Sequence, residues 1–74
     1  MKVMLFGMIA EKAGAAVLSV EASSLAHLKQ ELEQRITGLD RMSYAIAVDR
    51  RITAEDVRLS GQEEIAVLPP FAGG

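Results

Sequence analysis

SLAHLKQELEQRI, residues 24–36, is the stretch that decides the fold. Its apolar residues recur at three- and four-residue spacing: Leu25, Leu28, Leu32 and Ile36. This spacing places them along one face of a helix, while charged and amide side chains take the other face. Ser24 suits the N-cap position, and Gly38 marks where the helix is expected to end. The stretch therefore predicts an amphipathic helix whose leucine stripe needs an apolar surface to cover.

Apolar runs on both sides of this helix predict the strands of a sheet. The expected strands are residues 2–6, 15–20, 44–48, a short one around Ile52, and 64–68. Residues 8–13 are compatible with a short helix that Gly14 closes in the left-handed conformation. Pro69 ends the last strand because proline has no N–H to donate to a ladder. Residues 53–60 are expected to be irregular or to form one helical turn.

Length and element order together predict a single small α+β domain. A chain of 74 residues buries only about 60% of the surface that its unfolded form exposes, so it cannot build two cores. A four- to five-stranded mixed sheet with one apolar face, covered by one main helix, is the arrangement that these elements allow. Among the several α+β arrangements that fit this element order, the β-grasp, or ubiquitin-like, architecture is the one we expect. We expect it to span residues 1–74, with an exposed tail over residues 69–74.

Composition excludes several classes of function. The chain has no cysteine, so it has no disulfide, thiolate nucleophile or zinc-thiolate site, which fits a reducing compartment and a cytoplasmic location. The net charge is −2, and Lys and Arg are dispersed, which argues against nucleic acid as a partner. The apolar run at residues 3–10 is short and is followed by charged residues, so neither secretion nor a membrane span is expected.

The sequence offers no constellation of residues that would make the chain an enzyme. His27 is the only histidine, and a solvent-facing helical position is the simplest interpretation of it. Three acidic clusters, at residues 31–33, 55–56 and 63–64, are interpreted as a solvated rim. The serines lack a neighbouring base or a glycine-rich elbow. We therefore predict no metal site and no bound cofactor.

The end of the chain, Pro69-Pro70-Phe71-Ala72-Gly73-Gly74, is the exception. Six extended residues span on the order of 20 Å, long enough to enter the pocket of another protein. Two prolines stiffen the stem, while Gly73 and Gly74 keep the tip thin. The carboxylate of Gly74 is expected to attack the α-phosphate of ATP in a partner enzyme, which gives an acyl-adenylate that sulfur or an amine can displace. Two glycines that end the chain by chance are the alternative, which the Pro-Pro stem disfavours.

Residues 63–74, EEIAVLPPFAGG, resemble the end of the small subunit of molybdopterin synthase, a family of ubiquitin-like sulfur carriers. Supporting matches are residues 2–7 with Glu11 and Gly14, the helix start at residues 24–25 with Leu28, and residues 47–49. The chain departs from the family pattern at three turn or surface positions: Ala10, Asp49 and Gly61.

The resemblance implies that Gly74 is adenylated by a ubiquitin-activating-like adenylyltransferase that uses ATP. A sulfur donor protein would then convert Gly74 to a thiocarboxylate. The large subunit of molybdopterin synthase would receive the tail, and the sulfur would pass to a pterin precursor of the molybdenum cofactor. Gly73 would supply clearance, and Pro69, Pro70 and Phe71 would contact the partner. The chain itself would be a non-catalytic sulfur donor.

Three other functions fit the same sequence features. The chain could carry sulfur for thiamin or another thiolated product, although such carriers usually lack the Pro-Pro stem. It could be a ubiquitin-like modifier that is conjugated to lysines through Gly74. It could also be a β-grasp binding module with an inert tail. Sulfur transfer and conjugation begin with the same adenylate, so the sequence does not separate them.

Overall fold

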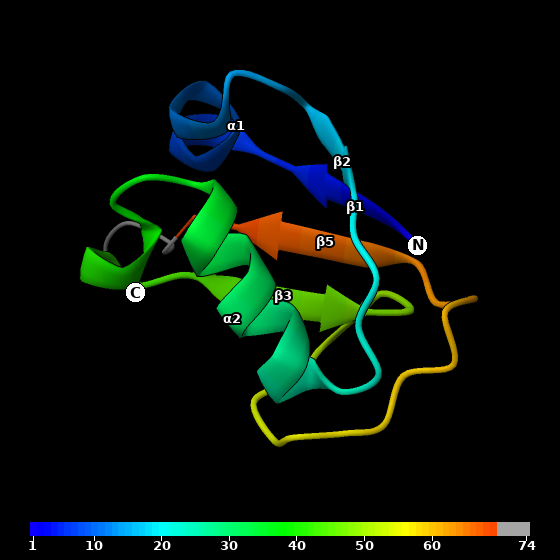
Figure 1. Ribbon diagram of the computed structural model, residues 1–74. Coiled ribbons are helices and arrows are strands. Elements are labelled where there is room, and N and C mark those ends of the chain that lie inside the picture. Colours follow the sequence, from blue (N-terminus) through cyan, green and yellow to red (C-terminus); the bar gives the residue numbers. More distant parts are fainter. Residues whose placement is uncertain (70–74) are drawn as a thin grey trace.

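The computed structural model describes residues 1–69 of the chain. Strand β1 (Lys2–Leu5) leads into helix α1 (Gly7–Ala13), and strand β2 (Val17–Ser19) into helix α2 (Leu25–Arg35). The short 3₁₀ helix η1 (Leu39–Arg41) precedes the last three strands: β3 (Ala45–Val48), β4 (Arg51–Ile52) and β5 (Ile65–Leu68). Figure 1 shows this order along the chain.

The five strands form one mixed sheet in the order β2-β1-β5-β3-β4. Strand β5 pairs in parallel with β1, with Val3 opposite Ile65 and Leu5 opposite Val67. It pairs antiparallel with β3 on its other side, and β2 and β4 form the two edges. The last strand of the chain is therefore the central strand of the sheet (Figure 1).

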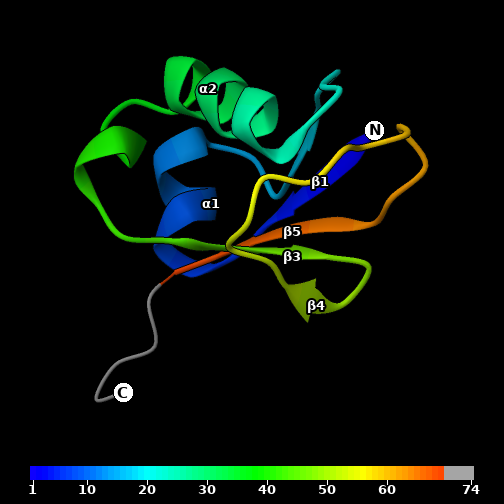
Figure 2. The same cartoon turned by 90° about the horizontal axis from the view of Figure 1, so that it is seen from below.

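Both α-helices lie on one side of the sheet, as Figure 2 shows. The fully buried core lies between this face and the helices, and it is entirely apolar among residues 1–69. Strands and helices contribute to it alike: Val3, Leu5, Ile9, Leu25, Leu28, Leu32, Ile36, Ile46, Ile65 and Val67. The predicted α+β architecture, a mixed sheet covered by one main helix, is confirmed.

Helix α2 begins where the sequence predicts but ends earlier than predicted. The Ser24 side chain accepts a hydrogen bond from the backbone N–H of His27 at 3.1 Å, which caps the first turn. The helix ends at Arg35, three residues before Gly38, because Ile36 takes an extended conformation with φ −111° and ψ 107°. Ile36 still reaches the core, so the apolar spacing extended the predicted helix too far.

The predicted strands are correct in number and position, with ends that differ by one or two residues. Strand β1 ends at Leu5, because Phe6 is already the N-cap residue of α1 and Gly7 turns the chain with φ +56°. Asp49 and Arg50 both have positive φ, 49° and 69°, which makes the tight turn between β3 and β4. Residues 53–60 are irregular, and buried Leu59 anchors them to the core.

Candidate functional site

The end of strand β5 is where the chain leaves the sheet toward its predicted functional tail. Leu68 is the last strand residue and pairs with Ala45 of β3. Pro69, the first residue of the predicted stem, is half-buried and is the last residue that the structure describes. The remaining predicted site residues lie outside the described residues: Pro70, Phe71, Gly73 and Gly74.

The β1–α1 junction lies beside the end of β5. The backbone N–H of Phe6 donates to the carbonyl oxygen of Val67 at 3.3 Å, one residue beyond the paired positions of the two strands. A Cβ atom on Gly7 would lie 3.2 Å from Cγ of Pro69. The pyrrolidine ring therefore packs beside the backbone of Gly7, at the position where the β1–β5 pairing ends because proline has no N–H to donate.

The sheet face opposite the helices carries an apolar row that crosses all five strands. Pairing in register places one residue of each strand side by side: Val17, Met4, Ala66, Ala47 and Ile52. We call this set the open-face row. Val17 at one edge is 49% exposed and Ile52 at the other is 60% exposed. Figure 2 shows the sheet edge-on, with the described helices all on its other side.

A second set of apolar residues joins the open-face row to the end of β5. Leu68 and Ala45 are paired, and they lie on the same face as the row because alternate residues of a strand share a face. Phe6 follows buried Leu5 and is 44% exposed. The apolar surface is thus continuous from the edges of the sheet to Pro69, which suits docking against another protein.

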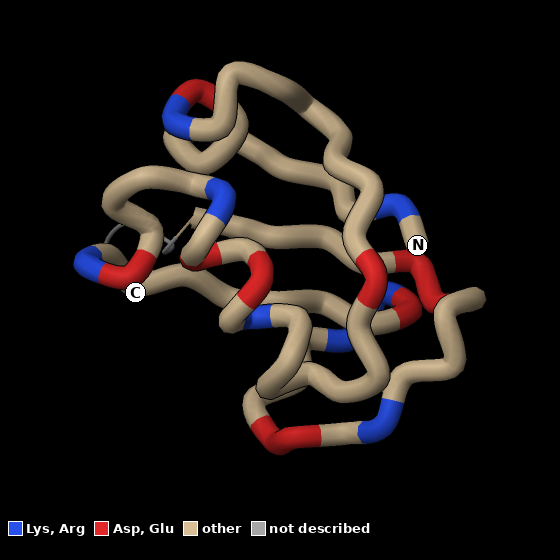
Figure 3. The backbone as a smooth tube through the Cα atoms, in the orientation of Figure 1, with Lys and Arg blue, Asp and Glu red and all other residues tan. Residues whose placement is uncertain are grey.

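Charged residues are absent from the centre of this surface, and Lys2 lies at its border on the same face as Met4. Residues 3–6, 45–48 and 65–68 carry no charge, whereas Lys, Arg, Asp and Glu alternate around helix α2 and the loops, as Figure 3 shows. The described chain has no single-sign stripe that would track a phosphate backbone, in line with the dispersed charges of the sequence.

Tyr44 ties the start of β3 to helix α2 near the point where the chain leaves β5. Its hydroxyl donates to a carboxylate oxygen of Glu33 at 2.6 Å. Burial is the main reason that the pKa of Tyr44 is raised above its ordinary value, and the acceptor carboxylate of Glu33 adds to the effect. The hydroxyl is therefore a firmly protonated structural donor.

The acidic residues at the other end of β5 serve turns, as the solvated-rim interpretation expects. The carboxylate of Glu63 accepts hydrogen bonds from the backbone N–H groups of Ser60 and Gly61, at 2.8 and 2.9 Å. These bonds lower the pKa of Glu63 to about 2, and the bond from Ser60 has the largest effect. Glu64 donates its backbone N–H to the Asp49 side chain at 3.0 Å. Neither carboxylate faces the other in a catalytic arrangement.

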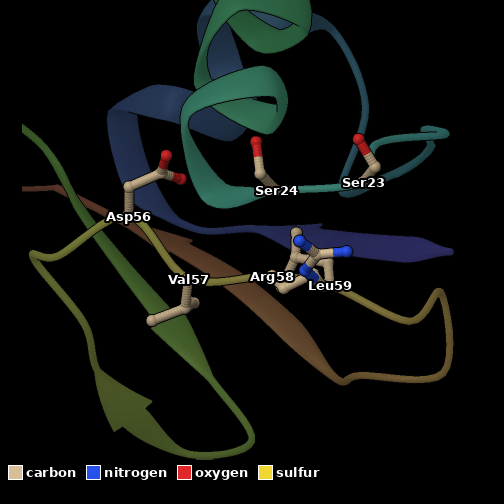
Figure 4. A pocket seen from close by; sticks show the side chains of 6 residues that line it. All are labelled: Ser23, Ser24, Asp56, Val57, Arg58 and Leu59. Carbon is tan, nitrogen blue, oxygen red and sulfur yellow. The ribbon is translucent and has the colours of Figure 1, made fainter.

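An open hollow of about 500 Å³ lies where helix α2 begins. Figure 4 shows its lining: Ser23, Ser24, Asp56, Val57, Arg58 and Leu59. The donors at this helix end already have partners within the chain, because Asp56 accepts from the N–H of Ala26 at 2.9 Å and Ser24 from that of His27. The hollow brings together neither a nucleophile and base nor a set of metal ligands.

Other candidate chemistry in the described part of the chain is sparse. His27 is exposed on the first turn of α2, as predicted, and its Nδ1 accepts from the backbone N–H of Ser23 at 3.4 Å. Among residues 1–69, no three His, Asp or Glu side chains come close enough together to hold a metal ion. No helix in the same range is long and apolar enough to cross a membrane.

Two parts of this site were not identified from the sequence. The contact of Gly7 with Pro69 was not predicted, because it depends on parallel pairing between the first and last strands. The open-face row was not predicted, although its alternation with core positions in residues 3–6 and 65–68 was a usable signal. Its edge members, Val17 and Ile52, can be assigned to the row only when the pairing register of the edge strands is known.

Comparison with solved structures identifies a relative of the same size. The chain is similar to SAMP1 from Haloferax volcanii, with a TM-score of 0.63 and 25% identity. The match covers 100% of this chain and 98% of that one, so the two folds correspond along their whole length. A search among curated proteins gave no match.

The comparison with family models is the more specific result. The model of the ThiS family matches residues 3–74, which includes both α-helices, all strand residues after Lys2, and the Gly73-Gly74 end. This match agrees with the five-stranded β-grasp fold and with the absence of a catalytic constellation in the described residues. The chain belongs to the ThiS family of ubiquitin-like sulfur carriers.

Proposed function

We propose that this chain is the sulfur-donating small subunit of a molybdopterin synthase. In this role Gly74 carries the sulfur as a thiocarboxylate and passes it to a pterin precursor of the molybdenum cofactor. The reactive residues that complete the reaction belong to partner proteins: an ATP-dependent ubiquitin-activating-like adenylyltransferase, a sulfur donor protein and the large synthase subunit.

The loading chemistry needs little from the carrier beyond a free carboxylate. A Gly74 carboxylate oxygen attacks the α-phosphorus of ATP, and pyrophosphate leaves. A sulfur nucleophile then attacks the carbonyl carbon of the acyl-adenylate, and AMP leaves. Gly73 and Gly74 carry no side chain, so the tip fits a narrow channel of the partner enzyme.

The apolar open face supports docking by the body of the carrier. It exposes Val17 and Ile52 beside small residues such as Ala66, and it continues through Leu68 to the stem at Pro69. A partner that covers this face would bury apolar area near the origin of the tail, which is how a specific protein interface gains affinity.

The single observation that carries the sulfur-carrier role is the family match that runs through Gly74. The structure adds that the central strand leads directly into Pro69. The Pro69-Pro70 stem is the sequence feature that favours the molybdopterin pathway over the other sulfur pathways.

The experiment is a sulfur-acceptor assay with the thiocarboxylated carrier. We expect it to convert the cyclic pterin precursor to molybdopterin in the presence of a large synthase subunit, and to leave a thiamin thiazole synthase reaction unsupported. Carrier lacking Gly74 is the control. Thiazole synthesis without molybdopterin formation would assign the chain to the thiamin pathway. Covalent adducts to lysines of many proteins in lysate, without sulfur transfer, would favour a protein modifier.

A further inference from the structure

We propose that Gly7 is a positioning residue for the tail: it forms a bare backbone seat for the ring of Pro69 and so sets the direction in which the chain leaves the sheet. The inference rests on the proposed function, because it concerns delivery of Gly74 to an adenylating enzyme. It assigns a role in that delivery to a residue 67 positions away in the sequence.

The proline ring lies close to the position that a Cβ atom on Gly7 would take. A Cβ atom at Gly7 would meet Cγ of Pro69 at 3.2 Å, Cδ at 3.8 Å and Cβ at 4.0 Å. Carbon atoms in optimal contact lie about 3.5–4.0 Å apart. A side chain at position 7 would therefore require the ring to move by a few tenths of an ångström.

Hydrogen bonds of Phe6 and the burial of Ile9 fix the backbone before and after Gly7. The N–H of Phe6 donates to Val67 of strand β5, and the Phe6 carbonyl accepts the N–H of Ile9 at 3.1 Å. Ile9 is fully buried, which anchors the first turn of α1 in the core. Gly7 thus lies on a fixed part of the backbone, against which a rigid proline ring has one preferred placement.

Positioning matters because adenylation requires the Gly74 carboxylate to meet the α-phosphorus at attacking distance. Misplacement by about 1 Å at a remote residue can reduce a rate by up to about 100-fold. The open face governs docking separately. A disturbed seat should therefore lower kcat for adenylation more than it raises KM.

The chain contains a matched control for the strain of a positive φ. Gly14, at the other end of α1, has φ +71°, compared with +56° at Gly7, and a Cβ there would meet nothing within 4 Å. Gly7→Ala and Gly14→Ala both place a side chain in the left-handed region. Only the first introduces a contact with Pro69, so the difference between the two variants isolates the seat.

The test measures Gly74 adenylation by the ubiquitin-activating-like enzyme encoded in the same genome, as ATP–pyrophosphate exchange, with full-length carriers. We expect Gly7→Ala to lower kcat about tenfold with little change in KM, and Gly14→Ala to leave both within about twofold. Pro69→Ala should also lower kcat. The double variant Gly7→Ala/Pro69→Ala should be no slower than Pro69→Ala alone, because no ring remains to displace. Equal kcat for Gly7→Ala and Gly14→Ala, or additive losses in the double variant, would overturn the inference.

A second readout keeps the inference separate from the proposed function. In the labelled wild-type protein, nuclear Overhauser effects between the Gly7 Hα protons and the Pro69 ring protons should be present, and they should persist in Gly14→Ala. Their absence overturns the seat whatever the kinetics show. If the wild type is not adenylated at all, the proposed function fails, and these effects still decide whether the seat exists. Should Gly7→Ala not fold, Pro69→Ala carries the kinetic test against wild type.

Discussion

Both faces of the sheet carry apolar rows, yet only one of these faces is covered by the helices. On the helix side, Val3, Ile65 and Val67 are completely buried beneath α1 and α2. On the opposite side, Val17 and Ile52 in the open-face row are 49% and 60% exposed. A face that needed only solubility would alternate to polar residues. We infer from this difference that the first face supplies stability, while the second offers an apolar surface to the partner proposed above.

The largest expected effect on stability comes from truncation on the covered face. Leu28→Ala removes a fully buried side chain from the stripe of α2 and should lower the free energy of unfolding by about 3 kcal/mol. Ile52→Ala is its counterpart on the open face and should cost under about 1 kcal/mol. Chemical denaturation measures both. Similar losses would show that the open face also belongs to the folded core.

A finer comparison changes polarity and keeps shape. Val3→Thr places a hydroxyl in the core and should cost about 2 kcal/mol, whereas Val17→Thr should change stability by less than about 0.5 kcal/mol. Val17→Thr should instead raise KM for Gly74 adenylation, since it makes the docking surface more polar. Thermal unfolding and the adenylation assay together check the pair. An unchanged KM would argue that partners dock elsewhere.

Removal of the Tyr44 hydroxyl should have a smaller effect. Tyr44→Phe deletes the 2.6 Å hydrogen bond to Glu33 and should cost about 1 kcal/mol at neutral pH. Glu33→Gln retains an acceptor and should cost less. Denaturant unfolding of the two variants distinguishes them, and an equal or greater loss in Glu33→Gln would mean that the bond does not depend on the carboxylate charge.

The smallest effect concerns the turn before β5 and depends on pH. The pKa of Glu63 is lowered from 4.5 to about 2 in the folded protein, so its ionised form adds stability above pH 4.5. This contribution is lost as the pH falls toward 2. The melting temperature of wild type should therefore exceed that of Glu63→Gln at neutral pH, and the two should converge in acid.

Glu64→Gln is the control for this turn, because its carboxylate is exposed and lies 3.5 Å from Arg50 in a surface ion pair. It should change the melting temperature little at any pH. A constant gap between wild type and Glu63→Gln across the acid range would refute the assigned role of the Glu63 charge.

Most of the fold could be predicted from local patterns. The stripe of Leu25, Leu28 and Leu32 identified the main helix, and Pro69 fixed the end of the last strand. The end of α2 was placed too late because buried Ile36 fits the helical spacing while its backbone is extended. Apolar spacing reports which side chains reach the core, and it does not report the backbone conformation that brings them there.

The candidate site likewise contains residues that local sequence patterns reveal and residues that they do not. The residues of the stem and tip were recognisable because proline and glycine have strong local preferences, although their roles remain predictions. The seat at Gly7 was not recognisable, since it depends on a parallel pairing between the two ends of the chain. Contacts of this kind carry no local signal, and the register of the sheet is needed to find them.

The most direct test of the central claim is the intact mass of the carrier after incubation with ATP, its activating enzyme and a sulfur source. We predict a gain that corresponds to exchange of one oxygen for sulfur, located at Gly74 by fragmentation and absent from the variant that lacks this residue. An unchanged mass for the wild-type chain, under conditions where the enzyme loads another carrier of the family, would contradict the account.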